Sequence, residues 1–214
     1  MSNHKKPLSY YYPILYFLYA ILWYASAYGD ELEKALITGI DSTAQLPFWE
    51  WQSNSLSIRL VQRLPDQTRG YFMARGFNKQ QAEQIAQSCI FQTIFKNKAK
   101  PGSKVIIEYD LSKWRTVTDG KKHTLKLRED WDRQWQKQKV TTKAQIAMRW
   151  SLLPTRQHYQ AQDYNWGMTA FDLTPGAKFN LEIYWKLNGQ IHTGVIPNVA
   201  CASDIHPDPN QLFD

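Results

Sequence analysis

The clearest pattern in the chain is an alternation of apolar and polar residues, which is typical of half-buried β-strands. Two dipeptides, Asp119-Gly120 and Asn188-Gly189, are of the kind that closes tight hairpins between such strands. Helical and strand patterns do not alternate repeatedly, which argues against a doubly wound α/β fold. Six or seven strands joined by turns predict a mainly β protein, an antiparallel sandwich or barrel. The strands are expected near residues 55–60, 105–111, 113–118, 121–128, 146–152, 179–187 and 191–195.

One segment, residues 78–96, has helical spacing instead. Asn78 and Gln81 stand three positions apart, as in a capping box at the start of a helix. The apolar positions that follow recur at three and four residues. We therefore expect one α-helix over about residues 78–96, inserted between the early strands. Its apolar positions are Ala82, Ile85, Ala86, Cys89, Ile90 and Ile94.

The N-terminus has the features of an export signal. Lys5 and Lys6 precede an apolar run at residues 13–24, and Ala25-Ser26-Ala27 supplies small residues at its end. The run is shorter than the roughly 20 residues that span a bilayer comfortably. We expect residues 1–27 to be a cleaved signal peptide, which makes the protein periplasmic or secreted. The alternative is an uncleaved anchor that leaves the domain outside the membrane.

The rest of the chain divides into three parts on this interpretation. Residues 28–54 have mixed polarity and read as a lead-in. Residues 55–201 hold the strands and the inserted helix, and so form the β-sandwich domain. Residues 202–214, which contain two prolines, read as a flexible tail.

A late segment resembles a known family. Leu173-Thr174-Pro175-Gly176-Ala177-Lys178-Phe179, followed by Leu181 and Ile183, is similar to the turn before a late core strand in fibronectin type III domains. That family often shows Leu-x-Pro-Gly-x-x-Tyr before alternating apolar residues, and Phe179 stands here in place of the tyrosine. The resemblance covers about a dozen residues and implies an immunoglobulin-like sandwich. It implies no function.

The predicted compartment determines the expected state of the two cysteines. Cys89 and Cys201 are the only ones in the sequence. In an oxidising, exported setting an isolated pair predicts one disulfide bond. The alternative is two buried free thiols. A catalytic cysteine is disfavoured because Cys89 falls on the apolar face of the predicted helix, whereas reactive thiolates need polar, accessible surroundings.

Charge and motifs narrow the function. The net charge is +7, and 14% of the residues are aromatic. The sequence contains no phosphate-binding glycine loop, haem-attachment motif, zinc-protease helix or Gly-x-Ser-x-Gly elbow. The absence of these motifs excludes several large enzyme classes, and no cofactor is expected.

A basic and aromatic segment, residues 121–143, is the first candidate binding surface. Trp131 and Trp135 stand one helical turn apart and are followed by Lys137 and Lys139. Such surfaces can bind single-stranded nucleic acid, but export makes that a poor fit. An envelope protein, an acidic glycan or an anionic surface such as lipid headgroups suits the positive charge better. The alternative is a solvated segment whose two tryptophans pack on the core.

A second candidate lies in residues 155–169, which we expect to be a long connection. Tyr164 and Trp166 are aromatic residues in its turn-rich part, residues 163–168. Exposed loops often carry binding residues, and these rings could stack on a sugar or contact a partner. The alternative is a loop anchored over the end of the sandwich by its own aromatic side chains.

Two further functions stay open. His192 with Met148 or Met168 would suit copper, because imidazole and thioether are copper ligands, although surface histidine and core methionine explain the same residues. An enzyme with a noncontiguous site, acting on cell-wall or glycan material, would need two convergent carboxylates. The leading interpretation is an exported, non-catalytic interaction or accessory module of the cell envelope. It would touch a membrane only if the N-terminal segment stays uncleaved.

Overall fold

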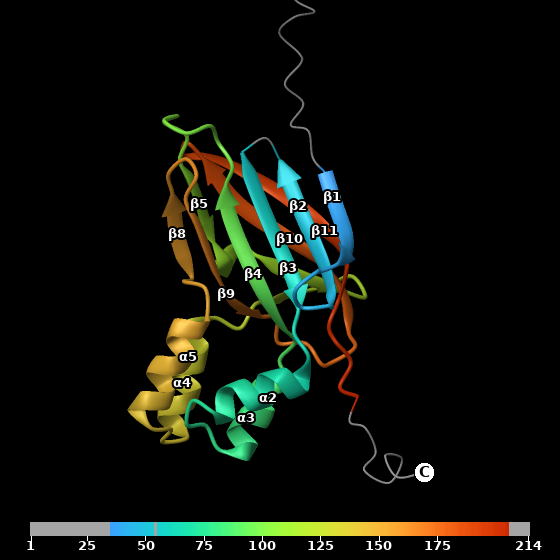
Figure 1. Cartoon of the computed structure of the whole chain (residues 1–214), viewed down its shortest axis with the longest axis vertical. Helices are drawn as coiled ribbons and strands as arrows, with labels where there is room; N and C mark the ends of the chain where they lie inside the picture. The colour runs from blue at the N-terminus through green and yellow to red at the C-terminus, as the bar shows by residue number, and fades with distance from the viewer. Residues whose placement is uncertain (1–34, 54, 206–214) are drawn as a thin grey trace, which may run out of the picture. The chain divides into compact units, whose positions relative to one another are not determined.

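The computed structural model describes residues 35–53 and 55–205 (Figure 1). The expected signal peptide or anchor, residues 1–27, lies outside the described residues, as do residues 206–214 of the expected tail. Within the described ranges, none of the helices has the length and apolar character required to cross a bilayer. Two antiparallel sheets and four α-helices make up this part of the chain.

Sheet A has five strands in the order β1-β2-β3-β4-β9, all antiparallel (Figure 1). The first two strands come from residues that we expected to be a lead-in to the domain. Their alternation is short, and Pro47 opens the second strand, so the pattern does not stand out in the sequence. The strands are β1 (Ala35–Ile40), β2 (Pro47–Ser53), β3 (Leu56–Gln62), β4 (Ile90–Asn97) and β9 (Tyr164–Ala170).

Sheet B is built around its longest pair of strands. β10 (Lys178–Leu187) pairs on one side with β11 (Gln190–Ala200), and on the other with β5 and β6. The hairpins at Asp119-Gly120 and Asn188-Gly189 are confirmed, and all four residues have the positive φ that a tight two-residue hairpin requires. The remaining strands are β5 (Ile107–Asp110), β6 (Arg115–Thr118), β7 (Lys121–Thr124) and β8 (Arg156–Tyr159).

The two sheets enclose the main core. Alternate residues of β2, β3, β4 and β10 point into it, so the expected mainly β fold with two antiparallel sheets is confirmed. Trp51 and Trp185, one from each sheet, meet edge-on with ring centroids 4.9 Å apart. Much of the aromatic content of the chain is therefore packing between the sheets.

The four helices form a second core. Their apolar residues pack with Ile90, Met168 and Ala170, which lie on the outer face of sheet A at one end of β4 and β9. The helices therefore cover one end of that face and leave the other end open. They are α2 (Pro65–Met73), α3 (Lys79–Ala86), α4 (Arg128–Lys137) and α5 (Thr142–Ser151), and a short 3₁₀ turn, η1, spans Leu111–Lys113.

The single helix expected over residues 78–96 is wrong in length. The Asn78–Gln81 capping box forms, but α3 ends at Ala86, and β4 begins at Ile90. Cys89 between them has φ +48°, which breaks the helical path. β4 is a central strand with apolar residues on both faces, and such a run has the same spacing as a buried helix face.

The strand expected at residues 146–152 is also wrong, because these residues belong mostly to α5. Met148 and Leu152 are one helical turn apart and both lie in the helical core, whereas Ile146 and Trp150 are exposed. The long connection expected at residues 155–169 instead contains β8 and most of β9. Tyr164 and Trp166 thus lie on a strand and not in a loop.

Candidate functional site

Trp131 and Trp135 lie in the helical core and not at a surface. Both are 0% exposed, and their rings stack with centroids 5.1 Å apart. Lys126 places its Nζ 3.9 Å from the centre of the Trp131 ring, so this face of the indole is covered as well. The interpretation of these two residues as exposed binding groups is therefore corrected. Lys137 and Lys139, at the end of α4, are exposed, and their role in binding stays a prediction.

Tyr164 and Trp166 have the opposite environment. They are 64% and 65% exposed and stand two residues apart on β9, an edge strand of sheet A. In the register with β4, Tyr164 faces Lys96 and Trp166 faces Ile94. Because Phe95 of β4 points into the core, these four side chains share the outer face of the sheet. We call Ile94, Lys96, Tyr164 and Trp166 the β4–β9 patch.

The backbone beneath the patch is fixed from its inner side. The Thr93 and Thr169 hydroxyls hydrogen-bond to each other across β4 and β9 at 2.7 Å, fully within the core. Asn165 Nδ2 donates to Gln157 Oε1 of β8 at 2.9 Å, which ties β9 to sheet B. Gly167 lets the chain approach Leu153, since a Cβ there would lie 2.8 Å from the Leu153 nitrogen. The aromatic pair therefore stands on a held strand.

The carboxylates on the same face of sheet A are already paired. Arg59 of β3 binds Asp41 at 2.8 Å and Glu50 at 2.9 Å. Burial of Glu50 works against its ionisation, but hydrogen bonds from Ser57, Arg59 and Gln52 outweigh burial and lower the pKa. Both acids are thus held in the ionised form and are satisfied by their own neighbours.

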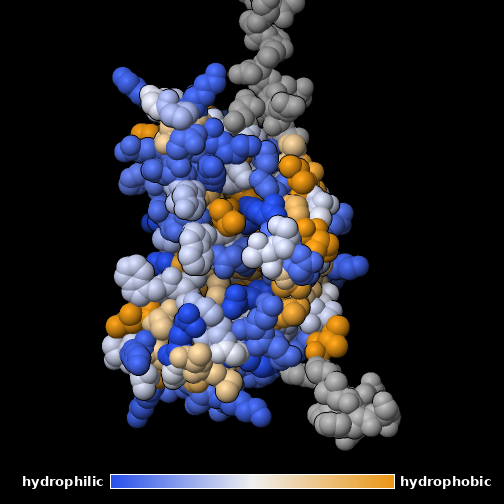
Figure 2. Space-filling view, viewed as in Figure 1, coloured by the Kyte–Doolittle hydropathy of each residue, from blue (hydrophilic) through white to orange (hydrophobic). Residues whose placement is uncertain are grey.

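The lysines near the patch are not paired in this way. Lys96, Lys98, Lys100 and Lys104 are exposed and enter none of the ion pairs between described residues. Lys98 donates only to the neutral Gln52 side chain, at 2.6 Å. Hydrophilic side chains dominate the view onto sheet A in Figure 2. The β4–β9 patch therefore combines flat aromatic rings with unneutralised positive charge.

Sequence reasoning missed Lys96 and Ile94 as members of the site. The signal was present, because Gln92, Ile94 and Lys96 alternate with buried residues in the same way as Tyr164 and Trp166 do. It was hidden by the assignment of residues 78–96 to a helix.

The structure places the proposed copper ligands in two separate regions. Met148 and Met168 are buried in the helical core. His192 lies on β11 of sheet B and stacks on Trp185, with ring centroids 5.5 Å apart. Copper binding stays a prediction, which titration with metal analysis would test.

One pair of carboxylates does share a cavity, as an enzyme acting on glycans would require. Glu108 and Asp110 alternate on β5 and line a hollow of about 550 Å³. Glu108 lies 3.7 Å from Lys186, and Asp110 lies 2.9 Å from Arg156. Burial opposes ionisation of Asp110, but hydrogen bonds from Ser112 and Arg156 prevail and lower its pKa. A glycosidase acid needs a raised pKa, so the state of Asp110 does not favour that role.

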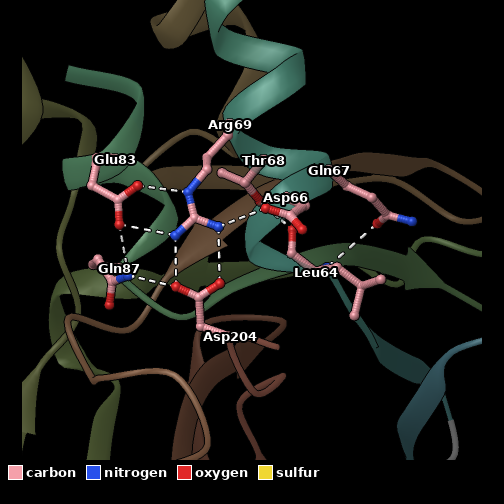
Figure 3. A network of polar contacts seen from close by, with 8 residues as sticks. All are labelled: Leu64, Asp66, Gln67, Thr68, Arg69, Glu83, Gln87 and Asp204. Atoms are coloured by element: carbon pink, nitrogen blue, oxygen red, sulfur yellow. Dashed lines mark hydrogen bonds and ion pairs between the residues drawn. The ribbon is translucent and has the colours of Figure 1, made fainter. Parts of the chain in front are cut away.

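The first residues of the expected flexible tail are held against the helices. Cys201 is bonded to Cys89, as the sequence predicted, with their Cα atoms 5.3 Å apart. Three residues later, Asp204 meets Arg69 of α2 through two contacts of 2.6 and 2.9 Å (Figure 3). Arg69 also binds Glu83 of α3 at 2.6 Å. The disulfide bond and this arginine thus fix residues 201–204 across α2 and α3.

This network predicts a defined acid dependence of stability. Hydrogen bonding to Arg69 lowers the pKa of Glu83 to about 2, from 4.5. Because the folded-state pKa is the lower one, Glu83 stabilises the fold above about pH 4.5, and the stabilisation is lost as the pH falls through 2. We expect the Glu83→Gln variant to lose less stability than the wild type between pH 4.5 and 2. Urea unfolding across this range measures the slope, and parallel profiles would contradict the assignment.

No match to this chain was found among family models, curated proteins or solved structures.

Proposed function

We propose that this chain is an exported, non-catalytic interaction module that binds an acidic glycan at the cell envelope through the β4–β9 patch. The observation that carries the proposal is the pair Tyr164 and Trp166, adjacent on one strand and each about two-thirds exposed. Leaving two large aromatic rings in water is unfavourable, and such exposure commonly marks a binding surface. Sugar rings present flat apolar faces that fit side chains of this kind.

The charge pattern supports an acidic ligand over a neutral one. Lys96 lies directly beside Tyr164, and Lys98 and Lys100 follow at the same end of β4. Asp41 and Glu50 are held by Arg59 and cannot neutralise these lysines, and the Asp163 carboxylate beside Tyr164 accepts a hydrogen bond from the Gln160 N–H. A polysaccharide with carboxylate groups would gain from both the rings and the ammonium groups. We prefer it to an anionic membrane or an acidic protein because rings two residues apart on a flat strand suit a repeating chain of sugars.

Export is part of the proposal. The basic, apolar and small-residue segments at residues 1–27 support it, and so does the Cys89–Cys201 bond, which is typical of oxidising compartments. We also propose an immunoglobulin-like relationship for the sandwich. Its support is the Pro175-Gly176 turn before β10, where Gly176 has φ +78°.

The patch predicts how substitutions change binding. We expect Trp166→Ala and Tyr164→Ala each to weaken binding of polygalacturonate at least tenfold, because each removes a stacking surface worth about 1.4 kcal/mol or more. Lys96→Gln should weaken binding less, and added salt should weaken it in the wild type. Isothermal titration calorimetry measures the affinities.

Matched controls separate this surface from general effects. Trp150→Ala removes an exposed indole from α5, and Lys121→Gln removes an exposed lysine from β7; neither should change binding. Neutral dextran should not bind. The proposal fails if acidic polysaccharides do not bind, if both aromatic variants bind normally, or if only anionic vesicles or acidic proteins bind.

A further inference from the structure

β1 is an edge strand with unusual exposure. All six of its residues, Ala35–Ile40, are exposed, and β2 is its one strand partner in the described chain. A strand edge presents backbone N–H and C=O groups that can pair with another strand. Proteins usually protect such an edge with lysine, proline or a bulge. β1 contains neither residue, and its register with β2 is unbroken.

The core-side residues of β1 are apolar but uncovered. Leu36 pairs with Trp51 and Thr38 with Trp49, so Leu36, Thr38 and Ile40 lie on the side of sheet A that faces the core. Leu36 is nevertheless 41% exposed and Ile40 60% exposed. Figure 2 shows hydrophobic side chains along the edge where Figure 1 draws β1.

A groove lies beside β1, between this strand and residues of β10 and β11. It has a volume of about 750 Å³, and its apolar lining includes Leu36, Trp51, Ile183 and Val195. Gly194 of β11 contributes to the opening, since a Cβ at this position would lie 2.8 Å from the Trp51 ring. Lys113 and Glu182 also line the groove, so apolar side chains brought to this edge by a partner strand would find a surface that is only partly apolar.

Charge narrows the choice of partner. The full sequence carries a net charge of +7, and removal of residues 1–27 with Lys5 and Lys6 leaves +5, so two copies repel each other over most of their surfaces. β1 has no charged side chain, so a strand that pairs with it needs no charged side chain for neutralisation. An uncharged, apolar strand is complementary to it, and β1 of a second copy is such a strand.

We propose that two copies of this chain associate by antiparallel pairing of β1 with β1. A two-fold axis normal to the sheet relates antiparallel neighbours, so paired residues must lie on the same face. With the axis through Thr38, the two Thr38 residues face each other, and Leu36 of each copy faces Ile40 of the other. The most exposed apolar side chains on the core side then cover one another, and a central threonine pair is favourable.

The pairing would also affect glycan binding. This consequence, unlike the dimer itself, rests on the proposed function. The two copies of sheet A would form a continuous sheet of ten strands, with β9 at each end. Each dimer would therefore carry two β4–β9 patches, one towards each end of that sheet. A long glycan could contact both patches, which raises its apparent affinity.

A charge swap at Thr38 tests the dimer. Sedimentation equilibrium of the protein as purified from cells should give about twice the mass of one chain at micromolar concentration. Thr38→Lys and Thr38→Glu each place like charges opposite one another, and each should weaken dimerisation at least tenfold. An equimolar mixture of the two variants should restore the dimer. Thr124→Lys, on the edge strand β7, is the matched control and should remain dimeric.

Any other result for these folded proteins contradicts the proposed dimer. Circular dichroism and an intact disulfide bond establish that the variants are folded. A monomeric wild type excludes the dimer, even if β1 captures an extended peptide from another protein. A dimer that survives both Thr38 substitutions forms through another surface. Because mass is measured without glycan, failure of glycan binding leaves this result unaffected.

Discussion

Replacing Trp135 by alanine is expected to lower the free energy of unfolding by about 3–5 kcal/mol. The side chain is 0% exposed and stacks on Trp131. It also meets the Phe77 ring edge-on, with centroids 5.2 Å apart. Removal of the indole leaves a cavity that α3, α4 and α5 cannot close without moving. Urea unfolding followed by circular dichroism measures the loss, and binding should weaken only as far as the protein unfolds.

Two variants make this prediction specific. Trp150→Ala removes an indole that is 82% exposed on α5, and the free energy of unfolding should change by no more than about 0.5 kcal/mol. Trp135→Phe keeps an aromatic ring and removes an N–H that has no hydrogen-bond acceptor among the described residues, so the loss should be smaller than with alanine. Equal stability of Trp135→Ala and Trp150→Ala would show that the helical core is wrongly assigned.

Removal of the Cys89–Cys201 bond is expected to lower the free energy of unfolding by about 4–5 kcal/mol. The bond joins residues 112 positions apart, and the cost of closing so long a loop in the unfolded chain accounts for this value in the chain-entropy model. Both cysteines are buried, so the double variant Cys89→Ala with Cys201→Ala keeps an apolar environment. Urea unfolding of this variant and of the oxidised wild type measures the difference.

Reductant provides the control for this second prediction. The wild type in dithiothreitol should unfold at about the midpoint of the double variant, and the double variant should not respond to dithiothreitol. A wild type whose midpoint is the same with and without reductant, although its thiols become free, would contradict the expected stabilisation.

Local features of the sequence predicted local features of the fold. Asp119-Gly120 and Asn188-Gly189 specify tight turns through backbone conformation alone, and both hairpins are present. Asn78 and Gln81 likewise satisfy the first free N–H groups of α3 within one turn. The disulfide bond was predictable because the sequence has only two cysteines and an oxidising compartment was expected. None of these predictions depends on which distant segment packs alongside.

Features that depend on tertiary packing were not predictable in the same way. Ile191 and Val195 look like the buried positions of β11, yet His192, Gly194 and Ile196 face the core. Gly194 is on the inner side because the Trp51 ring occupies the space that a side chain would need. The inner face of β11 thus fits a tryptophan about 140 positions earlier in the chain, and the periodicity of the sequence does not record this contact.

The two candidate aromatic pairs show the same limit. Spacing marks Trp131 with Trp135 and Tyr164 with Trp166 as neighbours, and both pairs are neighbours in the fold. Spacing does not state whether helices cover them. The helical layer encloses the first pair and stops short of the second, so only Tyr164 and Trp166 are left to contact a ligand.

The position of β10 in sheet B has a consequence for biosynthesis. β10 is the strand to which β5, β6 and β11 all pair, yet it comes from residues 178–187. While the ribosome adds the residues before it, β5 and β6 have no strand to join them, and one whole side of the sandwich is missing. Sheet B can therefore close over the core only after residues 178–187 have been synthesised, and until then the apolar core side of sheet A is open to aggregation.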